Sequence, residues 1–347
     1  MTKLPSYSKP ALTVGEQVKL LIGRGLVCAD SSQLECALFA VSYYRFSAYL
    51  FPFRSRAEQG KFVPGTTFEK VWSYYRFDRK LRFLVMDAIE RVEVAVRSSI
   101  VNQFALQHGV FGYRDAANFA KPLDNVRYQK TLRFIDGETM RSNEEFVSHF
   151  RASYDSTRGL PLWMAAEVMT FGNLLTFFRL MKMSDKKAVA RQFGLTSALM
   201  ESWLTALNCI RNICVHHGRL WNRHIAVCPL IPEKDPQWHE NDYPINPTRV
   251  YSVLTILNTL VKKVAPQSGW KDRLFALLAD FPDIHRLSMA IPAEFEKSAL
   301  WKEPEAEKEE DEAADSDKTD PSEPDPSESD STNGESPASA APMPTTK

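Results

Sequence analysis

The sequence contains no run of about 18 uninterrupted apolar residues, the length that a membrane-spanning helix requires. Its first ten residues lack the apolar segment of a secretory signal. Cysteine is scarce. The chain has five cysteines, an odd number, and none of them form a Cys-x-x-Cys pair. These absences argue against an integral membrane protein, a disulfide framework and a cysteine-ligated zinc site. We therefore expect a cytoplasmic protein with reduced thiols.

Patterns typical of β-strands are weak throughout, and no segment is repeated. In the longest periodic segment, residues 72–104, apolar side chains recur every three or four positions, as in a helix with one buried face. Thr13 and Glu16 have the spacing of a capping box at a helix start. Residues 51–65 are expected to form an irregular loop or a short hairpin. Further helices are predicted over residues 31–41, 162–168, 196–217, 250–264 and 270–278. The sequence thus predicts an all-α fold.

The formal net charge of zero conceals an uneven distribution of charge. Residues 303–347 carry 15 acidic and 3 basic side chains, which leaves 28 acidic and 40 basic side chains in residues 1–302. The acidic segment is poor in apolar residues, so it is predicted to be a disordered tail. Residues 1–302 form one predicted helical domain. Its excess of positive charge indicates either a polyanionic partner such as RNA or ordinary surface charge.

One short segment indicates a specific chemistry. Arg211, Asn212 and His216 stand near the end of the helical pattern over residues 196–217. Positions four apart share a helix face, so Asn212 lies beside His216, and the long side chain of Arg211 can reach both. A guanidinium binds phosphate oxygens, an imidazole moves protons near neutral pH, and an amide can orient either group. We predict that these three residues are catalytic, and that Gly218 adopts the left-handed conformation that ends the helix.

These groups suit RNA better than DNA as a substrate. The 2′-hydroxyl of RNA is an internal nucleophile beside the phosphorus, so cleavage needs only proton transfer and charge stabilisation. No metal ion or other cofactor is then required. His216, His217 and His224 suggest zinc as an alternative, but adjacent histidines point about 100° apart on a helix and seldom ligate one ion together. A further alternative is that Arg211 forms a structural ion pair with a carboxylate.

Basic, aromatic and amide side chains follow the motif directly. Side chains interleaved in this way can stack on a base and hold phosphates. The residues predicted to bind RNA or to support the site are His217, Arg219, Trp221, Asn222 and Arg223. Trp221 has a second interpretation as an anchor of the core. The same two alternatives apply to the aromatic and basic cluster of residues 43–49, for which core packing is preferred.

Several ordered blocks of the sequence resemble a known family. They comprise residues 9–13, 43–49, 90–97, 161–167, 171–172 and 206–223. Over about residues 9–264 the chain resembles the Abi-like family of bacterial abortive-infection proteins, the AbiD/AbiF group. That family is grouped with the HEPN superfamily of all-helical domains, many of which are metal-independent ribonucleases. Their motif is an arginine, a polar residue, three further residues and a histidine, and Arg211, Asn212 and His216 match it.

The resemblance implies a fold, an activity and a biological role. The expected fold is a HEPN-like helical bundle with extra helices. The expected activity is endoribonuclease cleavage by 2′-hydroxyl attack, which leaves a 2′,3′-cyclic phosphate. The expected role is that of a toxin in phage defence, with a toxin–antitoxin arrangement in which a small noncoding RNA restrains the protein.

HEPN sites usually combine two facing motifs, whereas this chain has one. Glu93 and Arg97 have helical spacing, but positions 102 and 103 hold asparagine and glutamine where a second motif needs histidine. We therefore expect a homodimer that joins two copies of the motif across a two-fold axis. Glu93 and Arg97 are predicted to support the site from a neighbouring helix. The alternatives to a ribonuclease are a non-catalytic RNA-binding module and a protein-interaction module.

Overall fold

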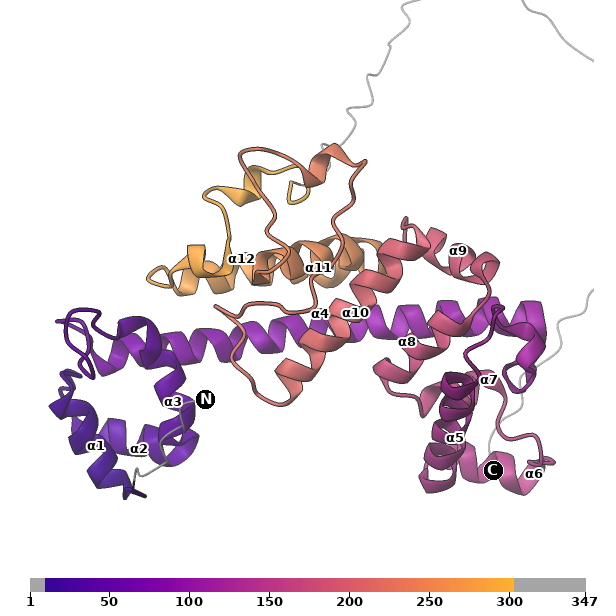
Figure 1. Cartoon of the computed structure of the whole chain (residues 1–347), viewed down its shortest axis with the longest axis horizontal. Coiled ribbons are helices and arrows are strands. Elements are labelled where there is room, and N and C mark those ends of the chain that lie inside the picture. Colours follow the sequence, from indigo (N-terminus) through magenta and orange to yellow (C-terminus); the bar gives the residue numbers. More distant parts are fainter. Residues whose placement is uncertain (1–9, 303–347) are drawn as a thin grey trace, which may run out of the picture. The chain divides into compact units, whose positions relative to one another are not determined.

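The computed structural model describes residues 10–302, which form twelve α-helices joined by loops and short 3-10 turns (Figure 1). These residues contain isolated β-bridges but no β-strand. The all-α prediction is therefore confirmed. The predicted acidic tail, residues 303–347, lies outside the described residues. The helices are α1 (Val14–Gly23), α2 (Ser31–Val41), α3 (Tyr43–Leu50), α4 (Phe68–His108), α5 (Asn125–Arg141), α6 (Glu145–Ser153), α7 (Leu162–Glu167), α8 (Phe171–Leu180), α9 (Met183–Gln192), α10 (Ser197–Val215), α11 (Val250–Val264) and α12 (Trp270–Asp280).

The longest helix, α4, carries a buried apolar stripe from Val71 to Phe104, as its periodicity predicts. It extends beyond the predicted range of 72–104 because both ends are capped. The Thr67 side chain accepts a backbone N–H bond from the first turn, and Gly109 ends the helix with φ at 82°. No helix within residues 10–302, α4 included, has both the length and the apolar sequence that a membrane crossing requires.

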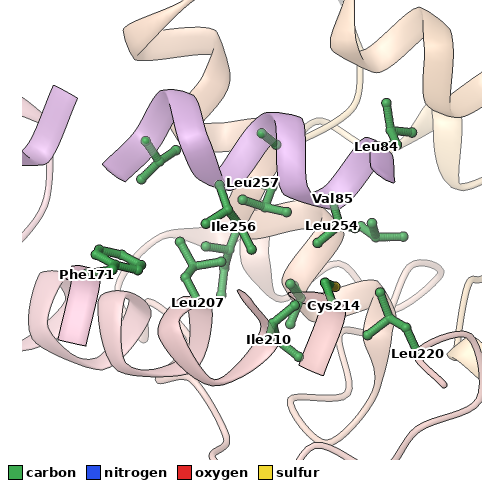
Figure 2. Close-up of a cluster of buried hydrophobic side chains, with 14 of the residues drawn as sticks. Leu84, Val85, Phe171, Leu207, Ile210, Cys214, Leu220, Leu254, Ile256 and Leu257 are labelled. Atoms are coloured by element: carbon green, nitrogen blue, oxygen red, sulfur yellow. The ribbon is translucent and has the colours of Figure 1, made fainter. Parts of the chain in front are cut away.

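Other helices of the described residues pack along α4. Helices α3, α7, α9, α10, α11 and α12 all contact it (Figure 1). Figure 2 shows the centre of this core, where Val85 of α4, Ile210 of α10 and Leu254 of α11 gather with other buried side chains. The buried face of α10 is therefore held by α4 and α11. This packing fixes the helix that carries the predicted motif.

All of the predicted helices are present. The capping box at Thr13 and Glu16 has both of its hydrogen bonds, and α2 has the predicted bounds. Five helices were not predicted, namely α3, α5, α6, α8 and α9. Helices α5, α6 and α9 each bury only two or three residues, so their sequences carry little helical periodicity in their apolar side chains.

Residues 51–65 form an irregular loop. The loop begins with a 3-10 turn at Phe51–Phe53, and a single antiparallel bridge joins Arg54 to Phe62. One bridge does not make a hairpin of two strands. Of the two predicted alternatives, the irregular loop is therefore confirmed and the hairpin is not. The loop leads into Thr67, the cap of α4.

Candidate functional site

Helix α10 begins where the sequence predicts and ends two residues earlier. The Thr196 side chain caps it by accepting a hydrogen bond from the backbone N–H of Leu199 at 3.2 Å. The last helical residue is Val215, and His216 is the C-cap. The His216 N–H still donates to the carbonyl oxygen of Asn212 at 3.0 Å. The helical relation between these two residues is therefore kept.

The turn that ends α10 differs from the prediction in one residue. The left-handed residue is His217, with φ at 57°, and not Gly218, so that prediction is wrong. The N–H of Gly218 donates to the carbonyl of Ile213 at 2.8 Å, and the N–H of His217 donates to that of Cys214 at 3.0 Å. These two bonds define a Schellman motif. Glycine is favoured at position 218 for space, because a Cβ there would lie 3.1 Å from Ile213 Cγ2.

The three predicted catalytic side chains all reach solvent. Asn212 and His216 are exposed, and the side chain of Arg211 is 32% exposed. Within residues 10–302 the side chains of Asn212 and His216 have no hydrogen-bond or ion-pair partner. A guanidinium, an amide and an imidazole thus stand at one helix end with bonding capacity left for a ligand.

Glu93 connects the motif to α4. Its Oε1 accepts a hydrogen bond from Arg97 Nη2 at 2.9 Å, and its Oε2 lies 4.0 Å from Nε of Arg211. Arg97 also donates to the carbonyl oxygens of Ala166 and Met169. One carboxylate therefore faces two guanidinium groups, and the three side chains together keep a net positive charge. Both Nη atoms of Arg211 have no protein partner in the described part of the chain, which leaves them free for an anion.

Asp78 of α4, which the sequence analysis missed, anchors the loop after the motif. Its buried Oδ1 accepts hydrogen bonds from the backbone N–H groups of Leu220 at 2.9 Å and Trp221 at 2.7 Å. Its Oδ2 accepts from the Tyr49 hydroxyl at 2.6 Å and from Arg82. Burial raises the pKa of both Asp78 and Tyr49, and the positive charge of Arg82 opposes the rise at Asp78. The bonds from Leu220 and Trp221 tie the loop to α4, and the bond from Tyr49 ties α3 to the same carboxylate.

A sequence signal for this anchor existed. Asp78 and Arg82 are four residues apart, which is the spacing of a helical ion pair. Both stand next to the apolar stripe of α4, so a buried pair was a possible interpretation. The partners Leu220 and Trp221 had no such signal, because they lie more than 140 residues further along the chain.

Two of the residues predicted to bind RNA serve the fold instead. Trp221 is 1% exposed, and its ring packs edge-on against Tyr74 with centroids 4.9 Å apart. No base can stack on it, so the RNA-stacking prediction for Trp221 is wrong and the core-anchor alternative is right. Arg219 is half-buried and donates to the carbonyl of Ala48. The other predicted residues are exposed (His217 and Arg223) or half-buried (Asn222).

The aromatic and basic cluster of residues 43–49 packs mainly against the core, as preferred from the sequence. Phe46 and Tyr49 are buried, whereas Tyr44 is exposed. Arg45 was not predicted to belong to the site, yet it donates a hydrogen bond to the carbonyl oxygen of His217. Helix α3 therefore contacts the turn that ends α10.

Cys214 lies inside the motif but is not a reactive thiol. It is 5% exposed, and burial raises its pKa to about 12. Since the thiolate is the nucleophilic form, little of it exists near neutral pH. We expect iodoacetamide to modify the exposed Cys36 and Cys228 in the folded protein and to spare Cys214, as measured by peptide mass spectrometry. Protein unfolded in urea is the control, and alkylation of native Cys214 as fast as that of Cys36 would contradict the burial.

The arrangement can bind a phosphate and transfer a proton with side chains alone. Arg211 offers two free guanidinium nitrogens, and His216 offers an unpartnered imidazole. In the part of the chain that the structure describes, no group of three or more His, Cys, Asp or Glu side chains is placed to hold a metal ion. The zinc alternative for His216, His217 and His224 thus has no ligand cluster to support it.

The motif and its supports all lie within one segment that matches a known family. A family model described as Abi-like protein matches residues 36–222, which is more than half of the chain. The chain belongs to the Abi-like family. Comparisons with curated proteins and with solved structures give no match.

Family membership associates the Abi-like chain with abortive infection, a defence against phage. The match is narrower than the resemblance expected over residues 9–264, because it begins within α2 and ends at Asn222. It includes Asp78, Glu93 and the whole of α10. The loop anchor and the motif of this Abi-like protein therefore belong to the part that defines the family.

Proposed function

We propose that this Abi-like protein is a metal-independent endoribonuclease of the HEPN type, which acts as a toxin in abortive infection with a noncoding RNA as its restraint. The single observation that carries the proposal is the end of α10. There Arg211, Asn212 and His216 are solvent-accessible side chains whose hydrogen-bonding groups are left largely unused by the fold. A guanidinium, an amide and an imidazole with open hydrogen-bonding capacity at one helix end can together bind a phosphate.

The proposed reaction needs a base, an acid and a group that stabilises negative charge on the phosphate. The 2′-oxygen of the RNA forms a bond to phosphorus, and the bond between phosphorus and the 5′-oxygen breaks. A base takes the proton of the 2′-hydroxyl, and an acid gives a proton to the leaving 5′-oxygen. His216 suits either proton transfer, and the free nitrogens of Arg211 suit the charge that develops on the phosphate oxygens. The products are a 2′,3′-cyclic phosphate and a 5′-hydroxyl.

A dimer supplies the second proton-transfer group. One chain carries a single motif, so one copy of His216 can serve as the base and His216 of a second copy as the acid. A two-fold axis brings identical surfaces together and so pairs the two motifs. We therefore propose that the active form is a homodimer with a shared site.

Purified full-length protein tests the proposal directly. We expect it to cut single-stranded RNA in the presence of EDTA and to leave fragments that end in a 2′,3′-cyclic phosphate. Removal of divalent metal should not lower the rate, because the proposed chemistry uses side chains only. Fragment ends can be read by mass spectrometry, and sedimentation of the same preparation reports the dimer. Cleavage that stops on addition of EDTA would contradict the proposal.

The contact between Arg211 and Glu93 favours a second candidate, a non-catalytic module in which the motif is structural. At 4.0 Å between Arg211 Nε and Glu93 Oε2 this contact is at the limit of an ion pair, whereas Glu93 bonds Arg97 at 2.9 Å. A single contact at this limit, made by an arginine side chain that is 32% exposed, contributes little stability. The module predicts RNA retention or protein binding without cyclic-phosphate products, which the cleavage assay distinguishes.

A further inference from the structure

A pocket of about 680 Å³ opens beside the end of α10, outside the set of residues assigned to the reaction. Its volume is in the range typical of sites for small ligands, about 300–1,000 Å³. Helices α2, α3, α4 and the end of α10 form its walls. Of its lining, the argument below uses Arg45, Tyr75, Arg79, Phe83, Val215 and His217.

The aromatic part of the pocket is firmly held at one side and open at the other. The Tyr75 ring stacks on Trp72 with centroids 4.7 Å apart and meets Tyr49 edge-on at 5.4 Å. Phe83 lies two helical turns further along α4 and is 63% exposed. A large exposed aromatic ring in the same pocket as a fixed one provides a surface on which a flat ligand can stack.

The pocket is also positively charged. Arg82 is neutralised by Asp78, but Arg45 bonds only the neutral carbonyl of His217. Arg79 has its guanidinium 5.2 Å from the centre of the Phe83 ring and no carboxylate partner among the described residues. No acidic side chain lines the pocket. Two uncompensated guanidinium groups next to aromatic rings match a ligand that combines a flat ring with a phosphate.

The pocket adjoins the motif through α10. Val215 on its wall stands four residues after Arg211, so both occupy one face of the helix about one turn apart. His217 on the wall directly follows His216. A polynucleotide whose phosphate lies at Arg211 and His216 can therefore place a neighbouring nucleotide in the pocket.

We propose that this pocket binds the RNA nucleotide next to the scissile phosphate, and the inference rests on the proposed ribonuclease function. The base stacks on the exposed Phe83 ring, Tyr75 forms part of the pocket wall, and the phosphate lies at Arg79 and Arg45. The pocket thereby selects single-stranded RNA, because only an unpaired base can unstack from its neighbouring bases and enter the pocket. It also sets the register of the strand on the motif.

Binding of an RNA that cannot be cut tests the pocket separately from the chemistry. The probe is a fluorescent single-stranded oligonucleotide with 2′-O-methyl groups, whose attacking hydroxyls are blocked, and anisotropy reports its affinity for the full-length protein. We expect Phe83→Ala to weaken binding about tenfold through lost stacking. We expect Arg79→Ala to weaken binding and to reduce the slope of log affinity against log salt by about 0.7, the value for one phosphate contact on a single strand. Arg79→Lys keeps the charge and should keep the slope.

Matched controls lie on the same helix. Arg76 is an exposed arginine of α4 beside Phe281 and outside the pocket, and Leu106 is an exposed apolar residue of α4. Arg76→Ala and Leu106→Ala should bind the probe as the wild type does. If the pocket variants bind no worse than these controls while the wild type still cleaves RNA, the pocket assignment fails and the ribonuclease proposal stands. If the wild type neither binds nor cleaves RNA, both fail.

A second copy of the chain is the competing occupant. Phe83 and Val215 are exposed apolar side chains, so they could belong to a dimer contact. A substitution that breaks such a contact would also lower the affinity for RNA, but indirectly. Sedimentation of Phe83→Ala decides between the two. A variant that remains dimeric and loses affinity supports the nucleotide site, and a variant that loses affinity because it becomes monomeric overturns it.

Discussion

His216→Ala is expected to lower the rate of RNA cleavage by about 10²–10⁴-fold, the contribution typical of a positioned acid or base. The same change should abolish the growth arrest caused by expression of the protein. Stability should be unaffected, because the His216 side chain is exposed and makes no hydrogen bond or ion pair within residues 10–302. Single-turnover cleavage and a thermal melt of the same preparation measure both effects.

Arg211→Ala should have a comparable effect on cleavage for a different reason. The variant loses the guanidinium that stabilises charge on the phosphate, while Glu93 keeps its shorter bond to Arg97. Arg211→Lys retains the charge but not the planar fork, and we expect it to recover only part of the rate. His224→Ala replaces an exposed histidine beyond the motif and is the matched control. Cleavage at the wild-type rate in both His216→Ala and Arg211→Ala would remove the catalytic assignment.

Asp78→Ala is expected to destabilise the protein by about 3–5 kcal/mol, the loss typical of breaking a buried ion pair. The variant leaves Arg82 buried without its partner and leaves the N–H groups of Leu220 and Trp221 without an acceptor. Asp78→Asn should also be costly, because its amide nitrogen is a donor that would face either the Arg82 guanidinium or the N–H groups of Leu220 and Trp221, which are also donors. Urea unfolding followed by circular dichroism measures the free energy of unfolding.

Asp87→Asn is the control for this change. Asp87 is a carboxylate on the same helix that pairs with Arg91 and Arg273 at a partly exposed position. Pairs of that kind contribute up to about 1 kcal/mol, so the control should unfold close to the wild type. Equal losses in Asp78→Ala and Asp87→Asn would show that the buried anchor has no special role.

Local patterns predicted most of the helices that bury a broad face, with α8 as the exception. The stripe of α4 and the cap of α10 at Thr196 depend on residues a few positions apart, and their spacing is visible in the sequence. Helices α5, α6 and α9 escaped prediction because each has only a few buried residues. The turn after α10 was assigned to Gly218 on glycine's usual preference. In the structure the left-handed residue is His217, whose carbonyl Arg45 of α3 holds.

The candidate site divides in the same way. Arg211, Asn212 and His216 could be predicted together because one helix dictates their relation. Glu93 and Arg97 could be paired with each other, but only folding brought Glu93 to Arg211. The sequence allowed Trp221 either to stack on an RNA base or to anchor the core. Its ring contact with Tyr74 of α4 shows that it anchors the core.

The sequence by itself determined the all-helical class, the approximate positions of the main helices and the spacing of the three motif residues, because these depend on periodicity within one helix. Only the tertiary structure decided what surrounds the motif. Asp78 meets Leu220 across 142 positions of the chain, and Arg45 meets His217 across 172. The pocket at Arg79 and Phe83 is likewise formed by helices far apart in sequence. Contacts of this kind depend on how buried faces fit together, and no local pattern encodes that fit.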